Sequence, residues 1–164
     1  MKKIVFLFLL LGSFISVIVN AQNGAQVTYT LESMDGSPDG YALIKVWNMG
    51  KKDKLTPQLA MYNAIHGILF KGIPGKSISS ANKGYAPLCP DGYNAHKEYF
   101  DNFFASNEYL QYVELANNGN VVAGDRFKLS NGSYKIGMVC LINITYLRKR
   151  LEQDGIIRSF GSIF

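Results

Sequence analysis

The chain has 164 residues, of which 48% are hydrophobic and 13% aromatic, and its formal net charge is +5. This apolar content is typical of a packed globular domain and excludes an intrinsically disordered chain. The basic excess is small and is not gathered into one strongly basic run, which argues against a dedicated nucleic-acid binder.

The first 21 residues have the pattern of an export signal. Lys2 and Lys3 precede an apolar run from Ile4 to Val19, and small residues lead up to a cut after Ala21. The run of about 16 residues is short for a membrane span, which needs about 20. We expect residues 1–21 to be a signal peptide and residues 22–164 to form a single α+β domain in the periplasm or outside the cell. No transmembrane segment is expected after the signal is removed.

The two cysteines, Cys89 and Cys140, are the only candidates for a disulfide. A bond between them would close a loop of about 50 residues, for which chain entropy gives roughly 4 kcal/mol. Cys140 lies in an apolar run where a free thiol packs like a small hydrophobic side chain, so two separate thiols are the alternative.

The first half of the chain predicts a hairpin and a helix. Apolar and polar residues alternate over 27–32, a more apolar strand follows at 41–47, and the Gly/Pro/Asp-rich segment 35–40 turns the chain between them. Thr56 is the expected N-cap of a helix with Pro57 at its first position and Gly72 and Pro74 at its end. Five apolar residues share one face of this helix: Met61, Tyr62, Ile65, Ile68 and Leu69.

The segment from Pro74 to Gly92 is rich in Gly, Ser, Asn and Pro and is predicted to be a long surface loop. Loops of this length are uncommon and are often functional. The candidate binding surface is therefore the loop 73–93, with Lys76, Tyr85 and Tyr93 as its exposed contact residues.

A second helix is predicted from an Asn94 cap to about Ala105, with a core-facing cluster of aromatics: Tyr99, Phe100, Phe103 and Phe104. Residues 109–115 fit a strand or a helix. A long central strand is expected over 134–144, then a third helix capped by Thr145 with Leu147 and Leu151 buried, and an edge strand within 156–164. The fold class is an antiparallel sheet of four to five strands packed against about three helices.

Asn131-Gly132 is a strong hairpin signal and predicts a two-residue loop. That register places Phe127 opposite Ile136 and Lys128 opposite Lys135. The two facing lysines indicate either a solvated sheet face or a docking surface for an acidic partner.

Several short motifs resemble ligand-binding sites but lack residues that such sites need. Gly75-Lys76-Ser77 lacks the glycine that a phosphate-binding loop needs five positions earlier and follows a helix rather than a strand. Asp35 to Gly40 lacks the acidic residue at the twelfth position of a calcium loop and is expected to be a turn. His66 and His96 fall on different helices, and His66 is expected to be partly buried and hydrogen-bonded. No cofactor or metal site is predicted.

Two short basic runs, Lys51 to Lys54 and Arg148 to Arg150, are expected to be a solvated turn and the outer face of the third helix. If the fold brought them together, they would form a patch for an anionic surface or a partner protein.

The segments 64–73, 99–104 and 109–113 resemble a family of small uncharacterised exported bacterial proteins. Their shared positions are aromatic and aliphatic, so the resemblance implies common packing and transfers no functional residue. The order of elements is also similar to small α+β modules of some envelope-assembly proteins, a likeness of fold alone.

From the sequence we expect an exported binding or assembly-accessory protein of the bacterial envelope. It would be non-catalytic and would act by protein–protein contact, without nucleic acid. The alternatives are a periplasmic inhibitor or immunity protein of a toxic enzyme, and a small envelope hydrolase. The hydrolase stays open because distant carboxylates can form a catalytic pair that no local motif reveals.

Overall fold

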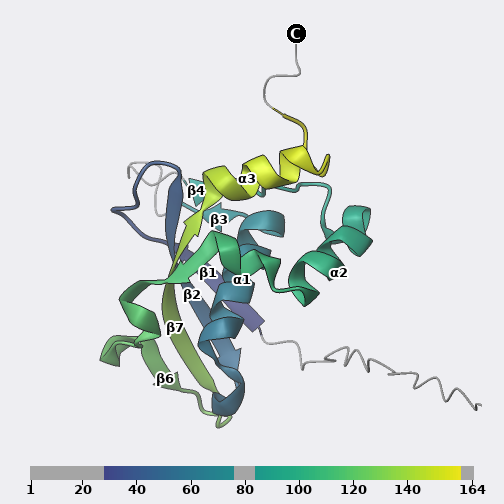
Figure 1. Cartoon of the computed structure of the whole chain (residues 1–164). Helices are drawn as coiled ribbons and strands as arrows, with labels where there is room; N and C mark the ends of the chain where they lie inside the picture. The colour runs from purple at the N-terminus through teal and green to yellow at the C-terminus, as the bar shows by residue number, and fades with distance from the viewer. Residues whose placement is uncertain (1–27, 76–83, 160–164) are drawn as a thin grey trace, which may run out of the picture.

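The computed structural model describes residues 28–75 and 84–159, and it confirms the predicted α+β class. Five antiparallel strands form one sheet in the order β1-β2-β7-β5, with β6 paired to another part of β7, and three helices pack against the sheet (Figure 1). The expected signal peptide lies outside the described residues.

The sheet consists of β1 (Thr28–Ser33), β2 (Tyr41–Gly50), β5 (Val113–Leu115), β6 (Arg126–Lys128) and β7 (Tyr134–Asn143). The helices are α1 (Pro57–Phe70), α2 (Lys97–Ala105) and α3 (Ile144–Gln153). Two short strands, β3 (Ile73–Pro74) and β4 (Gly84–Tyr85), pair with each other. Five 3-10 helices complete the description: η1 (Lys52–Lys54), η2 (Tyr93–His96), η3 (Glu108–Tyr112), η4 (Ala116–Gly119) and η5 (Ala123–Asp125).

The N-terminal hairpin and the central strand form as predicted. β1 pairs with β2 around the 35–40 turn, and β2 pairs with β7 along ten residues from Tyr41–Asn143 to Gly50–Tyr134. β7 is central because β2 occupies one of its edges while β5 and β6 share the other.

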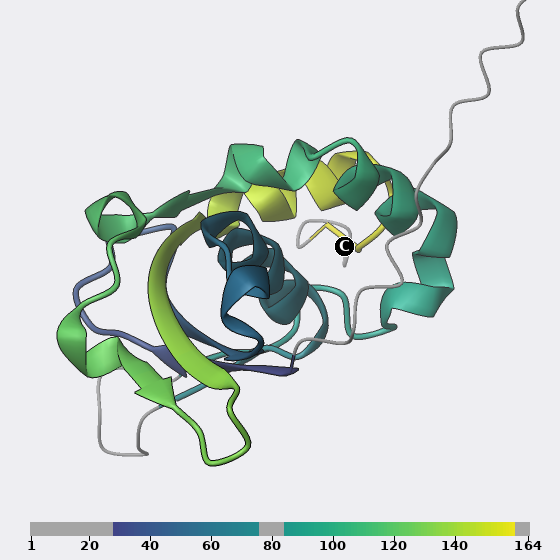
Figure 2. The ribbon, with the colours of Figure 1, turned by 90° about the horizontal axis from the view of Figure 1, so that it is seen from below.

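Helix α1 lies in the curve of the sheet, where Figure 2 shows it nearly end-on beside β7. The Thr56 hydroxyl accepts a hydrogen bond from the Leu59 amide at 3.2 Å, which confirms the predicted N-cap. Half of the helix is buried, and Gly67 allows it to approach β1: a Cβ at Gly67 would lie 2.2 Å from Leu31 Cδ1.

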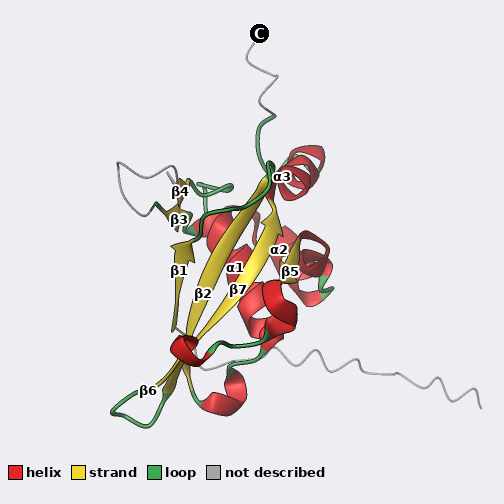
Figure 3. Ribbon diagram, turned by 90° about the vertical axis from the view of Figure 1, so that its left-hand side faces the viewer, coloured by secondary structure: helices red, strands yellow, loops and turns green. Residues whose placement is uncertain are grey.

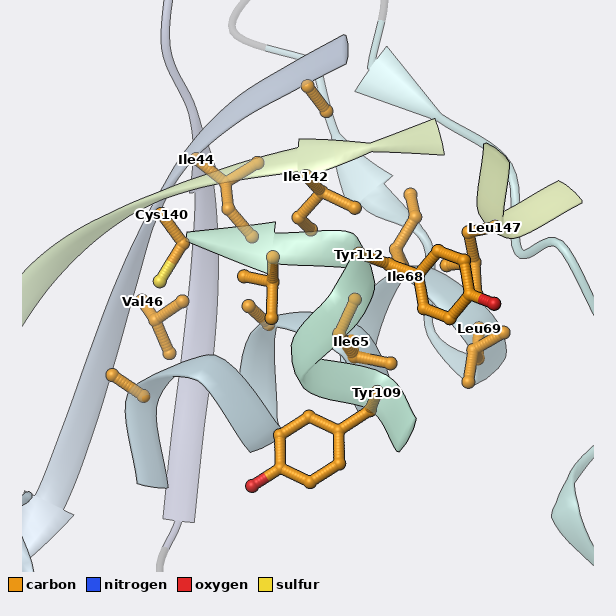
Figure 4. Packing of buried hydrophobic residues seen from close by; sticks show 14 of the residues in the cluster. Ile44, Val46, Ile65, Ile68, Leu69, Tyr109, Tyr112, Cys140, Ile142 and Leu147 are labelled. Atoms are coloured by element: carbon orange, nitrogen blue, oxygen red, sulfur yellow. The ribbon is translucent and has the colours of Figure 1, made fainter. Parts of the chain in front are cut away.

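The core lies between the sheet and the helices (Figure 4). Of the four aromatics predicted to face the core from α2, Phe100, Phe103 and Phe104 are buried and Tyr99 is half-buried. One polar contact is enclosed in this core. Asn63 of α1 donates to Asn48 Oδ1 of β2 at 2.6 Å, and Asn48 Nδ2 has no hydrogen-bond partner in the part of the chain that the structure describes.

Several predicted boundaries were wrong by a few residues. The chain forms η2 before α2 begins at Lys97, three residues after the expected Asn94 cap. The N-cap of α3 is Asn143, whose side chain accepts from the Tyr146 amide, rather than Thr145. The ambiguous segment 109–115 contains the end of η3 followed by β5, and residues 156–159 form no strand.

The C-terminal hairpin has a different register from the predicted one. The Leu129 amide donates to the Ser133 carbonyl, so the loop holds three residues, and Gly132 takes the left-handed conformation with φ of 79°. Phe127 therefore pairs with Lys135, and Lys128 pairs with Tyr134. A shift of one residue moves every side chain of β6 to the other face.

Candidate binding face

The two faces of the sheet differ in what covers them. Along β2 the residues Ala42, Ile44, Val46 and Asn48 are buried toward α1, while the alternate residues are only half-buried. In Figure 3 the strands β1, β2 and β7 stand in front of α1 and α2, so this view looks onto the side away from these helices. We call this side the outer face.

Trp47, the only tryptophan of the chain, is half-buried on the outer face. It pairs with Gly137 of β7, and a Cβ at Gly137 would lie 2.8 Å from Trp47 Cζ3. The indole ring therefore rests directly on the glycine backbone, which is the close approach that a glycine within a strand permits. The indole N–H donates to Glu32 Oε2 of β1 at 3.0 Å.

Cations and a second aromatic ring surround Trp47. Lys45 Nζ lies 5.2 Å from the centroid of the indole and Lys135 Nζ lies 4.7 Å from it, both within the range of cation–π attraction. The Phe127 ring is 5.9 Å away, centroid to centroid. The three-residue loop explains this contact, because it turns Phe127 to the same side as Lys135. We call Glu32, Lys45, Trp47, Phe127 and Lys135 the Trp47 patch.

The two lysines of the patch differ in their partners. Lys45 Nζ lies 2.8 Å from Asp125 Oδ1 of η5, and both side chains are largely shielded from solvent. Lys135 makes no ion pair within residues 28–75 and 84–159, so its charge is available to an external carboxylate. Phe127 is 47% exposed.

An apolar strip continues the patch along the outer face. Leu43, Val139 and Leu141 are half-buried there, and Leu43 pairs with Leu141 across β2 and β7. An apolar centre bordered by charged side chains is the usual composition of a protein–protein interface.

The residues that the sequence proposed for the 73–93 loop lie in different settings. Lys76 is outside the described residues. Tyr85 is exposed on β4, and its hydroxyl donates to the Tyr41 carbonyl at 3.2 Å. Tyr93 is half-buried in η2, and its hydroxyl donates to Asp101 at 2.7 Å. The binding loop stays a prediction, but both tyrosine hydroxyls already have partners within the chain.

Cys89 and Cys140 are both buried free thiols in the structure. Cys140 points into the core from β7 beside Val46 (Figure 4), and burial raises its pKa to about 12. The Cys89 amide donates to the carbonyl of Leu69 in the last turn of α1, and burial, followed by the charge of Asp91, raises the pKa of the Cys89 thiol. Neither thiol has the lowered pKa of a reactive cysteine.

His66 has the partly buried, hydrogen-bonded environment that the sequence predicts. Its Nδ1 lies 2.6 Å from the Tyr29 hydroxyl, and burial, with Lys71 as the second cause, lowers the pKa of the imidazole. The same burial raises the pKa of Tyr29. Five aromatic rings lie within 6.4 Å of the imidazole, centroid to centroid: Tyr29, Tyr62, Phe70, Tyr93 and Phe104. We interpret His66 as part of this packed cluster.

The fold does not bring the two basic runs together, because they follow opposite ends of the β2–β7 ladder. In α3, Arg148 pairs with Glu152 at 3.0 Å, and Arg150 pairs with Glu108 at 2.8 Å and with Asp154 at 3.2 Å. This second run is therefore largely neutralised by its own surroundings.

A small hydrolase would need a concave surface lined by converging polar groups. A shallow depression lies beside α3. It is lined by Ser106, Asn107, Glu108, Gln111, Tyr112 and Arg150. The charged groups of this depression, Glu108 and Arg150, are bonded to each other. Within residues 28–75 and 84–159, no cluster of three His, Cys, Asp or Glu side chains could hold a metal, and no helix has the length and hydrophobicity to cross a membrane.

Sequence reasoning missed the Trp47 patch, although two signals pointed to it. Along β2 one alternating set contains Lys45 and Trp47, a combination that favours a solvent-facing side. Gly137 interrupts an apolar strand, where a glycine often marks a close approach. No protein-family model, curated protein or solved structure matches this chain.

Proposed function

We propose that this protein is an exported, non-catalytic binding protein of the bacterial envelope that acts by protein–protein contact through the Trp47 patch and its apolar strip. The observation that carries the proposal is the position of the only tryptophan, half-buried on a sheet face away from α1 and α2 and next to a second aromatic ring. Tryptophan is strongly enriched among the residues that dominate binding energy at protein interfaces.

The patch also indicates what the partner presents. The Trp47 indole N–H is already bonded to Glu32, so the partner meets the ring and the apolar strip rather than a free donor. Lys135 lacks an ion-pair partner within the described part of the chain and would pair with a carboxylate. The partner is therefore expected to be a protein surface with an apolar centre and a carboxylate opposite Lys135.

The test is an affinity capture from envelope fractions with the wild type, Trp47→Ala and the control Tyr146→Ala. Tyr146 is an aromatic residue of α3 that is 62% exposed. The wild type and the control should retain the same stoichiometric protein, and Trp47→Ala should weaken its binding about 30-fold, the effect of losing about 2 kcal/mol at an interface.

The captured protein, purified by itself, should then change the fluorescence of Trp47, the only indole of the chain. If Trp47→Ala and Tyr146→Ala retain the partner equally, the proposal that the outer face binds it is refuted. If the partner is an enzyme whose activity stops at one-to-one binding, the protein is an inhibitor or immunity protein that uses the same face.

A further inference from the structure

Among residues 28–75 and 84–159, one end of the molecule carries most of the positive charge that no ion pair neutralises. The β2–β7 ladder ends at Gly50–Tyr134, and β6 also ends opposite Tyr134, so η1 and the β6–β7 hairpin lie together at the lower end in Figure 1. Five exposed cations gather here and are called the cationic end: Lys51, Lys52, Lys54, Arg126 and Lys128.

The cationic end is not neutralised by the fold. The five cations come from residues 51–54 and 126–128, and Asp53 is the one carboxylate in these two segments. None of the five forms an ion pair within residues 28–75 and 84–159. The rest of the described chain holds eight Lys and Arg against eleven Asp and Glu. Within the described residues, the fold thus separates a cationic end from a remainder that has three more acidic than basic side chains.

The cationic end also carries an exposed apolar side chain, Phe127. Phe127 stands between Arg126 and Lys128 in β6 and is 47% exposed. The sequence did not predict this exposure, because a two-residue hairpin loop would have turned Phe127 to the side of the buried Ile136. Side chains alternate along a strand, so Phe127 points to the side of Lys135 while Arg126 and Lys128 point to the other side. An exposed aromatic ring at a cationic surface is a combination that binds anionic bilayers, where the cations meet headgroups and the ring enters the interface.

We propose that the cationic end docks onto an anionic lipid bilayer surface, with Phe127 entering the headgroup region. Nucleic acid is less well matched, because successive bases stack on several aromatic rings and Phe127 is the only aromatic residue of η1 and β6. Docking at this end keeps Leu43 and Leu141, at the other end of the β2–β7 ladder, away from the lipid. The apolar strip would then remain open to a protein partner.

The experiment measures co-sedimentation with vesicles of phosphatidylcholine alone or mixed with phosphatidylglycerol. It uses the protein in the form recovered from the envelope fraction of expressing cells, the same form for every variant. The wild type should bind the anionic vesicles, and binding should fall steeply from 0.05 to 0.5 M salt, roughly the range over which screening becomes complete.

Each cation near an anionic surface contributes about a fivefold increase in partitioning. The double variant Lys52→Gln/Lys128→Gln should therefore bind about 30-fold more weakly. The matched control Lys149→Gln/Arg158→Gln removes two exposed charges outside the cationic end and should change binding less than about twofold. Phe127→Ser should weaken binding about tenfold, because the inserted ring is lost.

Three results would overturn the proposal: equal binding to both vesicle types, equal losses in the two double variants, or binding to acidic peptides or oligonucleotides without binding to vesicles. Phe127 belongs to both proposed surfaces, so Trp47→Ala separates the two proposals: it should lose the protein partner but keep the salt-dependent vesicle binding. If the wild type binds the vesicles but captures no protein partner from the envelope fractions, the proposed function alone is refuted.

Discussion

The inner and outer faces of the sheet are built from the same strands but have different roles. Toward α1 every second residue of β2 is buried, and the side chains are aliphatic except for Asn48. On the outer face the alternate residues are half-buried and include Lys45 and Trp47, with Glu32 beside them on β1. Because side chains alternate along a strand, one ladder supplies both a core and a chemically mixed surface.

The difference shows where each kind of polar group is tolerated. On the inner face the Asn48–Asn63 contact leaves Asn48 Nδ2 unpaired, at a cost in stability. On the outer face the polar groups of Trp47 and Lys45 are paired with Glu32 and Asp125, while Lys135 and the Phe127 ring remain available. Stability is thus concentrated on one side of the sheet, and the proposed binding surface lies on the other.

The sharpest test of this division compares two neighbours on β7. Ile142 is fully buried on the inner face, and Leu141 is half-buried on the outer face. Ile142→Ala should lower the free energy of unfolding by about 3–4 kcal/mol, whereas Leu141→Ala should cost only about 1 kcal/mol because its site is open to water. Chemical denaturation of both variants measures the two values. Equal losses would mean that the outer face is as closely packed as the core.

The sequence predicted this division in part. Alternation in residues 27–32, the Thr56-Pro57 start of α1 and the aromatic spacing of α2 each depend on local signals, and each is confirmed. The hairpin at Asn131-Gly132 failed by one residue, because the same glycine fits a two-residue loop and the observed three-residue loop. This difference of one residue in loop length determines whether Phe127 faces α1 or Trp47. The candidate site therefore depended on a register that pairing along β7 determines and local sequence does not.

Gly137→Ala tests whether the outer face depends on the contact between Trp47 and the glycine backbone. The added methyl group would meet the indole at about 3 Å, so the ring must move. We expect a loss of about 1–2 kcal/mol in unfolding free energy, typical of overpacking, with a change in Trp47 emission. Gly124→Ala is the matched control, since a Cβ there meets no atom within 4 Å. Unchanged emission in Gly137→Ala would contradict the close packing of the ring.

The smallest expected effect lies where α1 meets the edge strand β1, and it depends on pH. His66 Nδ1 lies 2.6 Å from the Tyr29 hydroxyl, and burial lowers the pKa of His66 below the ordinary value of about 6.5. At a pH between the pKa of His66 in the folded chain and its higher pKa in the unfolded chain, the unfolded chain binds more protons. The free energy of unfolding should therefore fall as the pH drops below about 6.5.

This dependence is measured by denaturation between about pH 8 and pH 5, above the range where most carboxylates titrate. The chain has two histidines, so the slope should disappear in His66→Gln and persist in His96→Gln. Tyr29→Phe should alter the slope as well, because it removes the hydroxyl that is hydrogen-bonded to His66. Equal slopes in the wild type and His66→Gln would show that this imidazole is as solvated in the folded chain as in the unfolded one. His66 would then lie at the exposed margin of the side of the sheet that the helices cover, and not within its packed core.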